Sequence, residues 1–540
     1  MLTDYRRRVL LVEDQPEVYR TLVRRLTADG YHVTLATNYA DAQRALDTEH
    51  LHLAIFDIRL EKDDEKNVDG LRLLENVAAL HLQDVMPCIV LTAHGTLPLA
   101  LHSLLELGAA HFIPKIRKHE GYIAKLLDVV GELFEERLCI GFDLRYEGNS
   151  LQRIEQCAHS LHAANGDLPA PEALTLQVRD LLGKLFIGAE QLWINEMNQG
   201  FSGSVVLYVR PTWPNGLGQS LVVKIGRRDK IEAEKKAHHE YVEHFLPTNH
   251  ATRLDDRYTR HLGALLYTLA NTDAADTLEF QQFYRKAPTE KIVTALQGLV
   301  REVCWPWYQG RTPPKYENLR DLYLEAFNLQ AQPDRLRQEF AALRPGVDLA
   351  APMLTFESPG VTLPNPLRWL EDDEASMQPV CRSITHGDLH ADNILINEAN
   401  QCWLIDFYRT RESHILRDFV VLETDIKFRL AAALSAEEFY QLETTLVQLE
   451  QPGELHFDST ASPEALKAAT VIAGLRAEAW ELFGRPTNHT ARQIQREYLI
   501  SLLMATLNIL RLQHFKEQPE LQPQRERALL SAALICWQLQ

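Results

Sequence analysis

The chain lacks the usual features of secreted, disulfide-linked and membrane proteins. Its seven cysteines are odd in number and scattered, and none forms a CxxC pair. This pattern suits reduced thiols better than a disulfide framework or a zinc site. No run approaches the roughly 20 apolar residues that span a bilayer, and the apolar run after residues 1–8 is too short for a signal peptide. We expect a soluble cytoplasmic protein with no membrane partner.

Positive charge is also in short supply. The 540 residues carry a formal net charge of −18, and the basic cluster at residues 6–8 is short. Without a basic stripe to neutralise phosphates, a duplex-binding module is excluded, so we expect no nucleic-acid partner. The length is too great for one core and predicts two or three domains.

Short apolar runs mark the first part of the chain. They cover residues 9–12, 53–56, 88–91 and 111–114, with amphipathic segments such as 16–28 and 39–49 between them. Continuous apolar strands are typical of a parallel sheet that is buried on both faces. Ligands of such α/β sheets gather at the carboxyl ends of the strands. Each of the four runs ends in polar residues, so we expect a site at that edge.

The polar residues at the strand ends form one chemical set. They are Glu13, Asp14, Asp57, Thr92 and Lys115. Crowded carboxylates repel one another unless a divalent cation lies among them. We expect Mg²⁺ to bridge Asp14, Asp57 and an incoming phosphoryl group, with Glu13 in support. Lys115 would then pair with the phosphoryl oxygens, and the Thr92 hydroxyl would move to meet them.

With these residues at these places, residues 1–138 resemble the receiver domain of bacterial response regulators. The resemblance implies a flavodoxin-like, doubly wound α/β fold and a sensor histidine kinase as partner. It implies Asp57 as the phospho-acceptor, with Thr92 and Phe112 as switch residues. It also implies Lys115 as the lysine that contacts the phosphoryl group.

The sequence departs from the receiver family in two places. Gly70 lies thirteen residues after Asp57, behind a charged insert at 61–66, whereas the family places a glycine closer to the acceptor. Ile116 replaces the usual proline after Lys115. The alternative is a degenerate receiver that is kept for dimerisation, so a homodimer stays open.

Residues 139–187 show apolar residues at helical spacing in 150–163 and 172–186, on either side of a loop with glycine and prolines. We interpret this segment as a helical linker. It would pass a signal between domains, pair two protomers, or simply pack its apolar faces. The sequence leaves these alternatives open.

The stretch THGDLHADN at 385–393 is the most informative part of the chain. Asp388 is followed by Asn393 and, after the apolar run 402–405, by Asp406. In kinases one such carboxylate orients the acceptor hydroxyl, while an Asn and a second Asp hold Mg²⁺ on the nucleotide phosphates. Phosphoryl transfer needs chiefly positioning and charge neutralisation, which three oxygen ligands on a rigid turn supply.

Features upstream of that stretch predict a nucleotide clamp. A turn of small residues between two apolar runs contains Gly200, Ser202, Gly203 and Ser204. Backbone N–H groups of such a turn can approach a polyphosphate. Lys224 ends the next apolar run and would bind phosphates if a carboxylate fixed its side chain. The following helix offers glutamates at 234, 240 and 243, and the spacing favours Glu240. A strand at 261–270 would lead into an adenine-binding hinge at 269–271.

Residues 190 to about 530 resemble the aminoglycoside-phosphotransferase and choline-kinase branch of the protein-kinase-like fold, on the motifs HGDLHxDNIL and IDF. The resemblance implies ATP as co-substrate and Mg²⁺ as cofactor. The residues that it implies are the base Asp388, the metal ligands Asn393 and Asp406, the phosphate-binding pair Lys224 and Glu240, and the structural Asp418. More faintly, the region is similar to ternary-complex-associated modules of bacterial conflict systems.

The resemblance predicts an α+β bilobal domain with a helical C-terminal lobe. Its N-lobe would cover 188–272 and its C-lobe 273–540, with an insert at 273–380. The aromatic residues 305–308 of that insert favour core packing over a substrate lid.

These features together predict a two-component response regulator whose Asp57 phosphorylation controls an ATP- and Mg²⁺-dependent phosphotransferase. The phosphate acceptor, a small molecule or a protein, stays unknown. The alternative is a non-catalytic regulator whose kinase-like domain binds a nucleotide or a partner protein. Retention of Asp388 argues against it, because a binding module needs no catalytic base.

Overall fold

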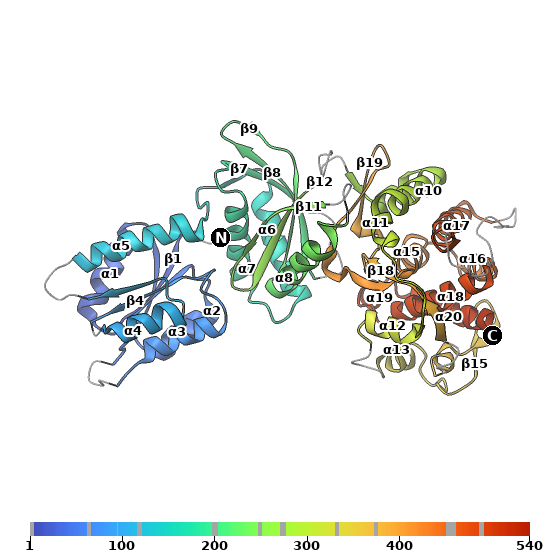
Figure 1. Ribbon diagram of the computed structural model, residues 1–540, viewed down its shortest axis with the longest axis horizontal. Coiled ribbons are helices and arrows are strands. Elements are labelled where there is room, and N and C mark those ends of the chain that lie inside the picture. Colours follow the sequence, from blue (N-terminus) through green and yellow to red (C-terminus); the bar gives the residue numbers. More distant parts are fainter. Residues whose placement is uncertain are drawn as a thin grey trace. The chain divides into compact units, whose positions relative to one another are not determined.

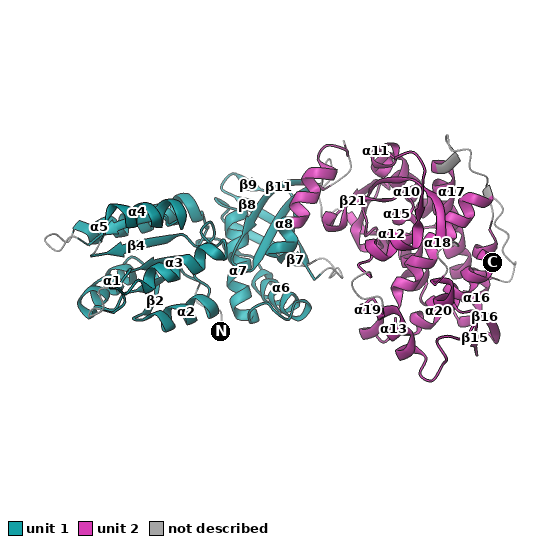
Figure 2. Cartoon of the chain, turned by 60° about the horizontal axis from the view of Figure 1, so that its bottom comes forward, with its two compact units in different colours: residues 1–232, 253–268 teal, residues 233–252, 269–540 magenta. Residues whose placement is uncertain are grey.

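The computed structural model describes residues 5–61, 66–93, 95–115, 121–196, 203–246, 251–269, 277–329, 334–371, 376–449, 461–484 and 491–540. The chain divides into two compact units, shown in teal and magenta in Figure 2. The first comprises residues 1–232 and 253–268, and the second comprises residues 233–252 and 269–540.

The first domain is a parallel sheet between two layers of helices (Figure 1). Its strands are β1 (Arg8–Val12), β2 (His32–Ala36), β3 (Leu53–Phe56), β4 (Cys88–Thr92) and β5 (His111–Pro114). Its helices are α1 (Pro16–Ala28), α2 (Tyr39–Thr48), α3 (Asp69–Ala79), α4 (Leu97–Leu101) and α5 (Gly121–Glu132). The strand order β2-β1-β3-β4-β5, with all pairs parallel, is the doubly wound flavodoxin-like arrangement that the sequence predicted.

Two apolar cores explain why the strands of this domain read as continuous apolar runs. Helices α2 and α3 cover one face of the sheet, and α1 and α5 cover the other. Each of the central strands β1, β3 and β4 contributes buried side chains to both cores. A strand with two buried faces cannot alternate apolar and polar residues.

A second sheet follows in the same unit and is mostly antiparallel, in the order β11-β12-β10-β8-β7-β6 with β9 paired to β8. Its strands are β6 (Arg145–Tyr146), β7 (Gln191–Glu196), β8 (Val205–Trp213), β9 (Gly216–Leu217), β10 (Leu221–Arg227), β11 (Ala251–Tyr258) and β12 (Leu262–Leu269). The associated helices are α6 (Ser150–Ala164), α7 (Pro171–Leu185) and α8 (Arg228–Ala237).

The segment that we interpreted as a linker is an integral part of this second domain. The apolar faces of α6 and α7 share one core with strands β7, β8, β10 and β12. Leu174, Val178 and Leu181 are fully buried in that core. Of the three alternatives, packing of the helices on their own domain is therefore the one observed. Without α6 and α7, an apolar face of the sheet would be exposed to water, which explains why the two helices pack on it.

The second unit is predominantly helical. Its helices are α9 (Phe280–Lys286), α10 (Thr289–Gly298), α11 (Trp305–Gln309), α12 (Leu319–Ala326), α13 (Arg335–Leu343), α14 (Pro366–Trp369), α15 (Arg417–Asp425), α16 (Ala436–Gln448), α17 (Pro463–Gly484), α18 (Ala491–Ile509), α19 (His514–Glu517) and α20 (Pro523–Leu539). Its strands are β13 (Thr277–Glu279), β14 (Lys315–Asn318), β15 (Met353–Phe356), β16 (Val361–Pro364), β17 (Met377–Val380), β18 (Arg382–Thr385), β19 (Ile394–Asn397), β20 (Cys402–Leu404) and β21 (Arg411–His414). Among the described residues, no helix is both long and apolar enough to cross a bilayer.

The aromatic run at 305–308 contributes to the core of this unit, as expected. Trp307 and Tyr308 are each only 1% exposed. The indole N–H of Trp307 donates to the carbonyl of Tyr241, and the Tyr308 hydroxyl donates to Asp418 at 3.0 Å. Buried Trp and Tyr side chains need such partners for their polar ends.

Candidate functional sites

The first candidate site lies at the carboxyl ends of β1 and β3. These strands are parallel neighbours, with Val12 opposite Phe56, so the residues that follow them meet at one edge. The carboxylate oxygens of Glu13, Asp14 and Asp57 lie within 4.8 Å of one another. Three carboxylates at this spacing are the donor set that Mg²⁺ prefers.

Lys115 balances the charge of this acidic pocket. Its Nζ donates to Glu13 Oε2 and to Asp57 Oδ2, both at 2.6 Å. Burial lowers the pKa of Lys115, but Asp57 and Glu13 outweigh that effect and the pKa is raised. Burial raises the pKa of Glu13 to about 7, against the attraction of Lys115. The pocket thus holds a fixed cation beside the residue predicted to accept phosphate.

The two predicted switch residues lie next to this pocket. Thr92 is fully buried at the end of β4, and its carbonyl accepts from the N–H of Lys115 at 2.7 Å. Phe112 of β5 is half-buried, and a Cβ at Gly95 would lie 2.9 Å from its ring. The set predicted from four separate segments is therefore gathered at one edge of the sheet.

Gly70 resolves the unusual spacing noted in the sequence. Its N–H donates to the carbonyl of Ile58 at 3.0 Å, and a Cβ at this position would lie 1.8 Å from the carbonyl oxygen of Asp57. Only glycine fits against the backbone of the predicted acceptor. Residues 62–65 and Ile116 lie outside the described residues, so the peptide after Lys115 stays untested.

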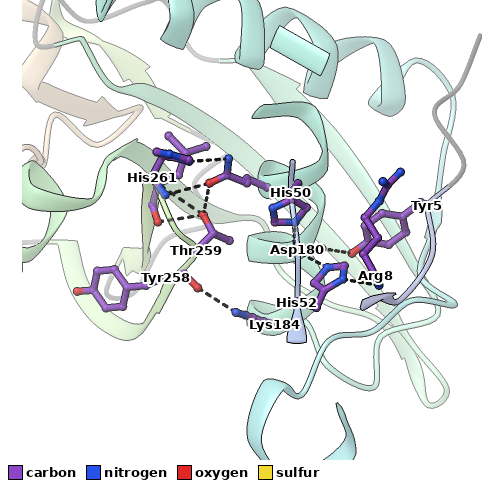
Figure 3. Close-up of polar contacts among 11 residues, drawn as sticks. Tyr5, Arg8, His50, His52, Asp180, Lys184, Tyr258, Thr259 and His261 are labelled. Carbon is purple, nitrogen blue, oxygen red and sulfur yellow. Dashed lines mark hydrogen bonds and ion pairs between the residues drawn. The ribbon is translucent and has the colours of Figure 1, made fainter. Parts of the chain in front are cut away.

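A second cluster, which the sequence did not reveal, lies where the receiver-like domain meets the second sheet domain (Figure 3). Asp180 of α7 is 1% exposed and accepts from three groups of the first domain. His50 Nε2 lies 2.5 Å and His52 Nε2 2.9 Å from its Oδ2, and the Tyr5 hydroxyl donates to its Oδ1 at 3.0 Å. Two histidines and one carboxylate within reach of one another also resemble a metal site.

Hydrogen bonding argues against a metal in this cluster. The backbone N–H of Arg8 donates to Nδ1 of His52 at 2.8 Å, so Nδ1 is an acceptor and Nε2 must carry the proton. A protonated Nε2 has no lone pair for a metal, and it donates to Asp180 instead. Burial raises the pKa of Asp180, but His52 and His50 outweigh it and hold the pKa well below its usual range. We call this cluster of Tyr5, His50, His52 and Asp180 the interdomain latch.

The third candidate site is built on the hairpin of β19 and β20 in the second unit. Asn393 precedes β19 and Asp406 follows β20, and the pairing of Ile394 with Leu404 places their two flanks side by side. The N–H of Ile405 donates to the carbonyl of Asn393 at 3.1 Å, which extends the pairing towards the site. One hairpin therefore positions both residues predicted to hold Mg²⁺.

The loop that carries Asp388 is held by hydrogen bonds at both ends. The Asn393 amide donates to the carbonyl of Asp388 at 2.8 Å. The fully buried carboxylate of Asp418 accepts from the N–H groups of His386 and Gly387, each at 2.8 Å. Asp418 thus has the structural role that the sequence resemblance implied. Arg409 Nε lies 3.3 Å from Asp388 Oδ2.

The backbone at this site adopts conformations that most residues avoid. Gly387 has φ of +80°, and a Cβ there would lie 2.3 Å from the carbonyl oxygen of Arg409. Asp406 has φ of +67°, a left-handed conformation that is uncommon outside glycine. Strain of this kind tends to cluster at functional sites.

The residues predicted to bind nucleotide are partly described. Gly203, with φ of +73°, is braced by Asn165, whose amide donates to the glycine carbonyl at 2.9 Å. Ser204 and Lys224 are buried, at 5% and 3% exposure. Gly200, Ser202 and the expected adenine-binding hinge at 269–271 fall on residues outside those described or at their edge, so these predictions stay untested.

The acidic partner expected for Lys224 stays a prediction. Glu240 is exposed in the π-helical turn His238–Val242 that follows α8. Glu234 of α8 is 1% exposed and accepts from the N–H of Phe407 at 3.3 Å. These observations do not test which glutamate pairs with Lys224, so the expected pair with Glu240 is kept.

Comparison with known proteins agrees with the geometry of the first domain. Residues 9–126 match the family model for the response regulator receiver domain. They are 36% identical over 107 residues to the transcriptional regulatory protein GlrR of Escherichia coli K12, and 31% identical over 113 residues to the alginate biosynthesis transcriptional regulatory protein AlgB of Pseudomonas putida. These matches cover 20% and 21% of this chain and 22% and 23% of the relatives, so the chain spans about a fifth of the length of each.

Solved structures of receiver domains are also similar to part of this chain. A CheY-like receiver domain protein from Methanospirillum hungatei is 26% identical, with a TM-score of 0.21, and covers 24% of this chain and 95% of that one. The HemR receiver domain from Leptospira biflexa is 32% identical, with a TM-score of 0.20, and covers 23% and 93%. The family-model match identifies the N-terminal domain as a response regulator receiver domain, a class that sensor histidine kinases phosphorylate in two-component signalling.

The remainder of the chain matches a different family model. Residues 189–341 and 329–511 match ternary complex associated domain 9, and together these segments cover more than half of the chain. The protein belongs to the ternary complex associated domain 9 family, with a receiver domain at its N-terminus. The faint similarity seen in the sequence is thereby confirmed. The kinase-like interpretation of residues 188–540 is not established by these matches and stays a prediction.

Proposed function

We propose that this protein is a response regulator in which phosphorylation of Asp57 controls an ATP- and Mg²⁺-dependent phosphotransferase. The observation that carries the catalytic half is the hairpin of β19 and β20. It sets Asn393 and Asp406 on its two flanks, and Asn393 is hydrogen-bonded to the loop of Asp388. A binding module has no need for that combination of base and ligands.

Each residue of this site has a separate task in the proposed reaction. Asp388 orients the acceptor hydroxyl and takes its proton. Asn393 and Asp406 offer oxygen ligands for Mg²⁺, which neutralises charge on the nucleotide phosphates when bound. Lys224, buried in the middle of β10, contributes a cation for the phosphates, and Glu240 is the acid expected to fix it.

The receiver site supplies the regulatory half of the proposal. A phosphoryl group on Asp57 adds roughly two negative charges beside Lys115, which already donates to Asp57. The phosphoryl oxygens compete for the lysine and give the Thr92 hydroxyl a new partner. A sensor histidine kinase is the expected donor.

The acceptor assignment is tested by labelling with a small phospho-donor and Mg²⁺. Wild-type protein should gain one acid-stable, hydroxylamine-labile phosphate, and Asp57→Ala should gain none. Asp84→Ala, an exposed aspartate of the same domain, is the matched control and should label normally. Persistent label in Asp57→Ala would show that another residue accepts the phosphate.

The catalytic assignment is tested by ATP consumption in the presence of cell metabolites and candidate proteins, with and without Asp57 phosphorylation. Asp388→Ala should keep nucleotide binding and lose turnover. Glu398→Ala, an exposed residue on the same hairpin, should keep both. Equal ATP consumption by wild type and Asp388→Ala would favour a regulator that binds a nucleotide or partner without transfer.

A further inference from the structure

Three arginines meet at the end of helix α12, close to the proposed catalytic base. Arg411 and Arg417 donate to the same carbonyl oxygen, that of Ala326, at 3.4 and 3.3 Å. Arg511 donates to the next carbonyl, that of Phe327. Guanidinium groups that share an acceptor repel one another, so their convergence needs a physical explanation.

Capping of the helix explains part of this arrangement. The C-terminal carbonyls of a helix attract cations, and Arg411 and Arg511 satisfy two of them. Capping explains only one N–H group of Arg417, the one that donates to the Ala326 carbonyl; the side chain is 1% exposed and lies above the ring of Phe327 at 5.8 Å. The Nε and Nη1 atoms of Arg417 have no hydrogen-bond partner among the described residues.

Other buried arginines of this unit are neutralised in the usual way. Arg429 forms ion pairs with Asp392 and Asp425, and Arg476 forms one with Glu423. Within the described part of the chain, no carboxylate is paired in this way with Arg417. Asp418 and Asp388 attract Arg417 electrostatically, but neither forms a direct ion pair with it among the described residues. A buried charge without a direct ion pair is costly, which suggests that an external anion completes this site.

The unpaired arginine lies within electrostatic reach of the proposed catalytic base. Burial lowers the pKa of Arg417 to about 10, Arg411 and Arg409 lower it further, and Asp418 and Asp388 oppose them. The pKa of Arg511 is also lowered to about 10, first by burial, with Asp388 again opposing. Arg409 lies beside Asp388 itself.

We propose that this arginine cluster (Arg411, Arg417 and Arg511) binds an anionic group, a phosphate or a carboxylate, on the small-molecule acceptor of the phosphotransferase. The inference rests on the proposed function. The acceptor hydroxyl oxygen bonds to the γ-phosphorus of ATP, the bond from that phosphorus to the β–γ bridging oxygen breaks, ADP leaves, and the hydroxyl proton passes to Asp388. The planar donors of arginine suit both anions.

Calorimetric titration of full-length protein with inorganic phosphate, and separately with malonate, tests the site directly. Wild type should bind at least one of the two probes, and comparison of the two separates phosphate from carboxylate recognition. Arg417→Met replaces the guanidinium by an apolar side chain of similar length. It should weaken binding of the probe about tenfold or more, because charge-assisted hydrogen bonds are lost. Arg417→Lys keeps the positive charge but loses the planar guanidinium, so its affinity for the probe should lie between those of wild type and Arg417→Met.

An exposed arginine provides the matched control. Arg368→Met removes a guanidinium that is 54% exposed, and it should leave probe binding unchanged. Equal binding by wild type and a folded Arg417→Met protein overturns the inference, as does a wild type that binds neither probe.

The outcomes also distinguish this inference from the proposed function. Asp388→Asn should still bind the probe. If probe binding depends on Arg417 but no acceptor supports ATP consumption, the anion site is supported and the phosphotransferase activity is contradicted. If an acceptor is found that carries no anionic group, the phosphotransferase stands and the anion site falls.

Discussion

The backbone N–H of Arg8 and Nδ1 of His52 form a hydrogen bond of 2.8 Å that fixes which nitrogen of the imidazole carries the proton. Because Nε2 is then a donor, His52 ties the receiver domain to Asp180 of the second domain without a metal. The receiver is thus joined to its neighbour through buried polar groups. Such groups are stabilising when every member is satisfied and costly when one is removed.

Asp180→Ala should therefore destabilise the first unit strongly. The substitution leaves His50, His52 and Tyr5 without their shared acceptor in a buried site. We expect a loss of about 3 kcal/mol in the free energy of unfolding, measured by urea denaturation. Asp143→Ala, an exposed aspartate of the same unit, should change it by less than about 0.5 kcal/mol. Similar losses in the free energy of unfolding for the two variants would show that the interdomain latch does not stabilise the first unit.

The latch should also make stability depend on pH. Burial holds the pKa of His52 below its ordinary value of about 6.5, so the unfolded chain binds more protons than the folded one below that pH. The contribution of His52 is thus complete above about pH 6.5 and is lost as the pH falls towards the folded pKa. The depressed pKa of Asp180 adds a loss at more acidic pH, below the ordinary range of a carboxyl.

Thermal unfolding between about pH 7.5 and 5 checks this sign. The midpoint of the first unit should fall as the pH decreases. His52→Gln keeps a donor for Asp180 and removes the titrating ring, so its midpoint should fall less steeply. A steeper or equal fall in His52→Gln would place the pH dependence elsewhere.

Much of the receiver site was predictable because its functional residues follow the ends of strands. Asp57 and Lys115 each follow a continuous apolar run, and parallel strands bring such positions to one edge. Asn393 and Asp406 were predictable for a similar reason, since they flank two short runs that form a hairpin. In these cases a local pattern determines where the side chain lies.

Other features depend on contacts that no local pattern records. His50 lies 130 residues from Asp180 in sequence, and no local sequence pattern around either residue predicts their contact. Arg417 was equally hidden, because arginine is almost always exposed.

Gly70→Ala should destabilise the receiver domain, because the new Cβ would lie 1.8 Å from the carbonyl oxygen of Asp57. We expect a loss of about 1–3 kcal/mol from this overpacking, with slower labelling of Asp57 as its backbone shifts. Gly131→Ala is a control that should change stability in the opposite direction. Its Cβ meets nothing within 4 Å in helix α5, so stability should rise by about 0.5–1 kcal/mol. Urea denaturation of the two variants measures the difference, and equal effects would show that the close approach at Gly70 is relieved without cost.

Asp418 provides the last prediction, because its carboxylate accepts from three donors that hold the loop of Asp388. The N–H groups of His386 and Gly387 and the hydroxyl of Tyr308 all point to it. Asp418→Asn replaces one acceptor oxygen by a donor in a fully buried site, so we expect a loss of about 2–4 kcal/mol in the free energy of unfolding. Tyr308→Phe removes one of the three donors and should cost about 1 kcal/mol.

The graded pair of variants separates loop support from general damage to the core. Urea denaturation should rank wild type, Tyr308→Phe and Asp418→Asn in decreasing stability, and ATP consumption should fall in the same order. Glu398→Gln, on the exposed turn of the neighbouring hairpin, should match wild type in both measurements. If Asp418→Asn folds as stably as wild type, the carboxylate is not needed to hold the loop. The positioning of Asp388 would then depend on the Asn393 amide and the left-handed turn at Gly387.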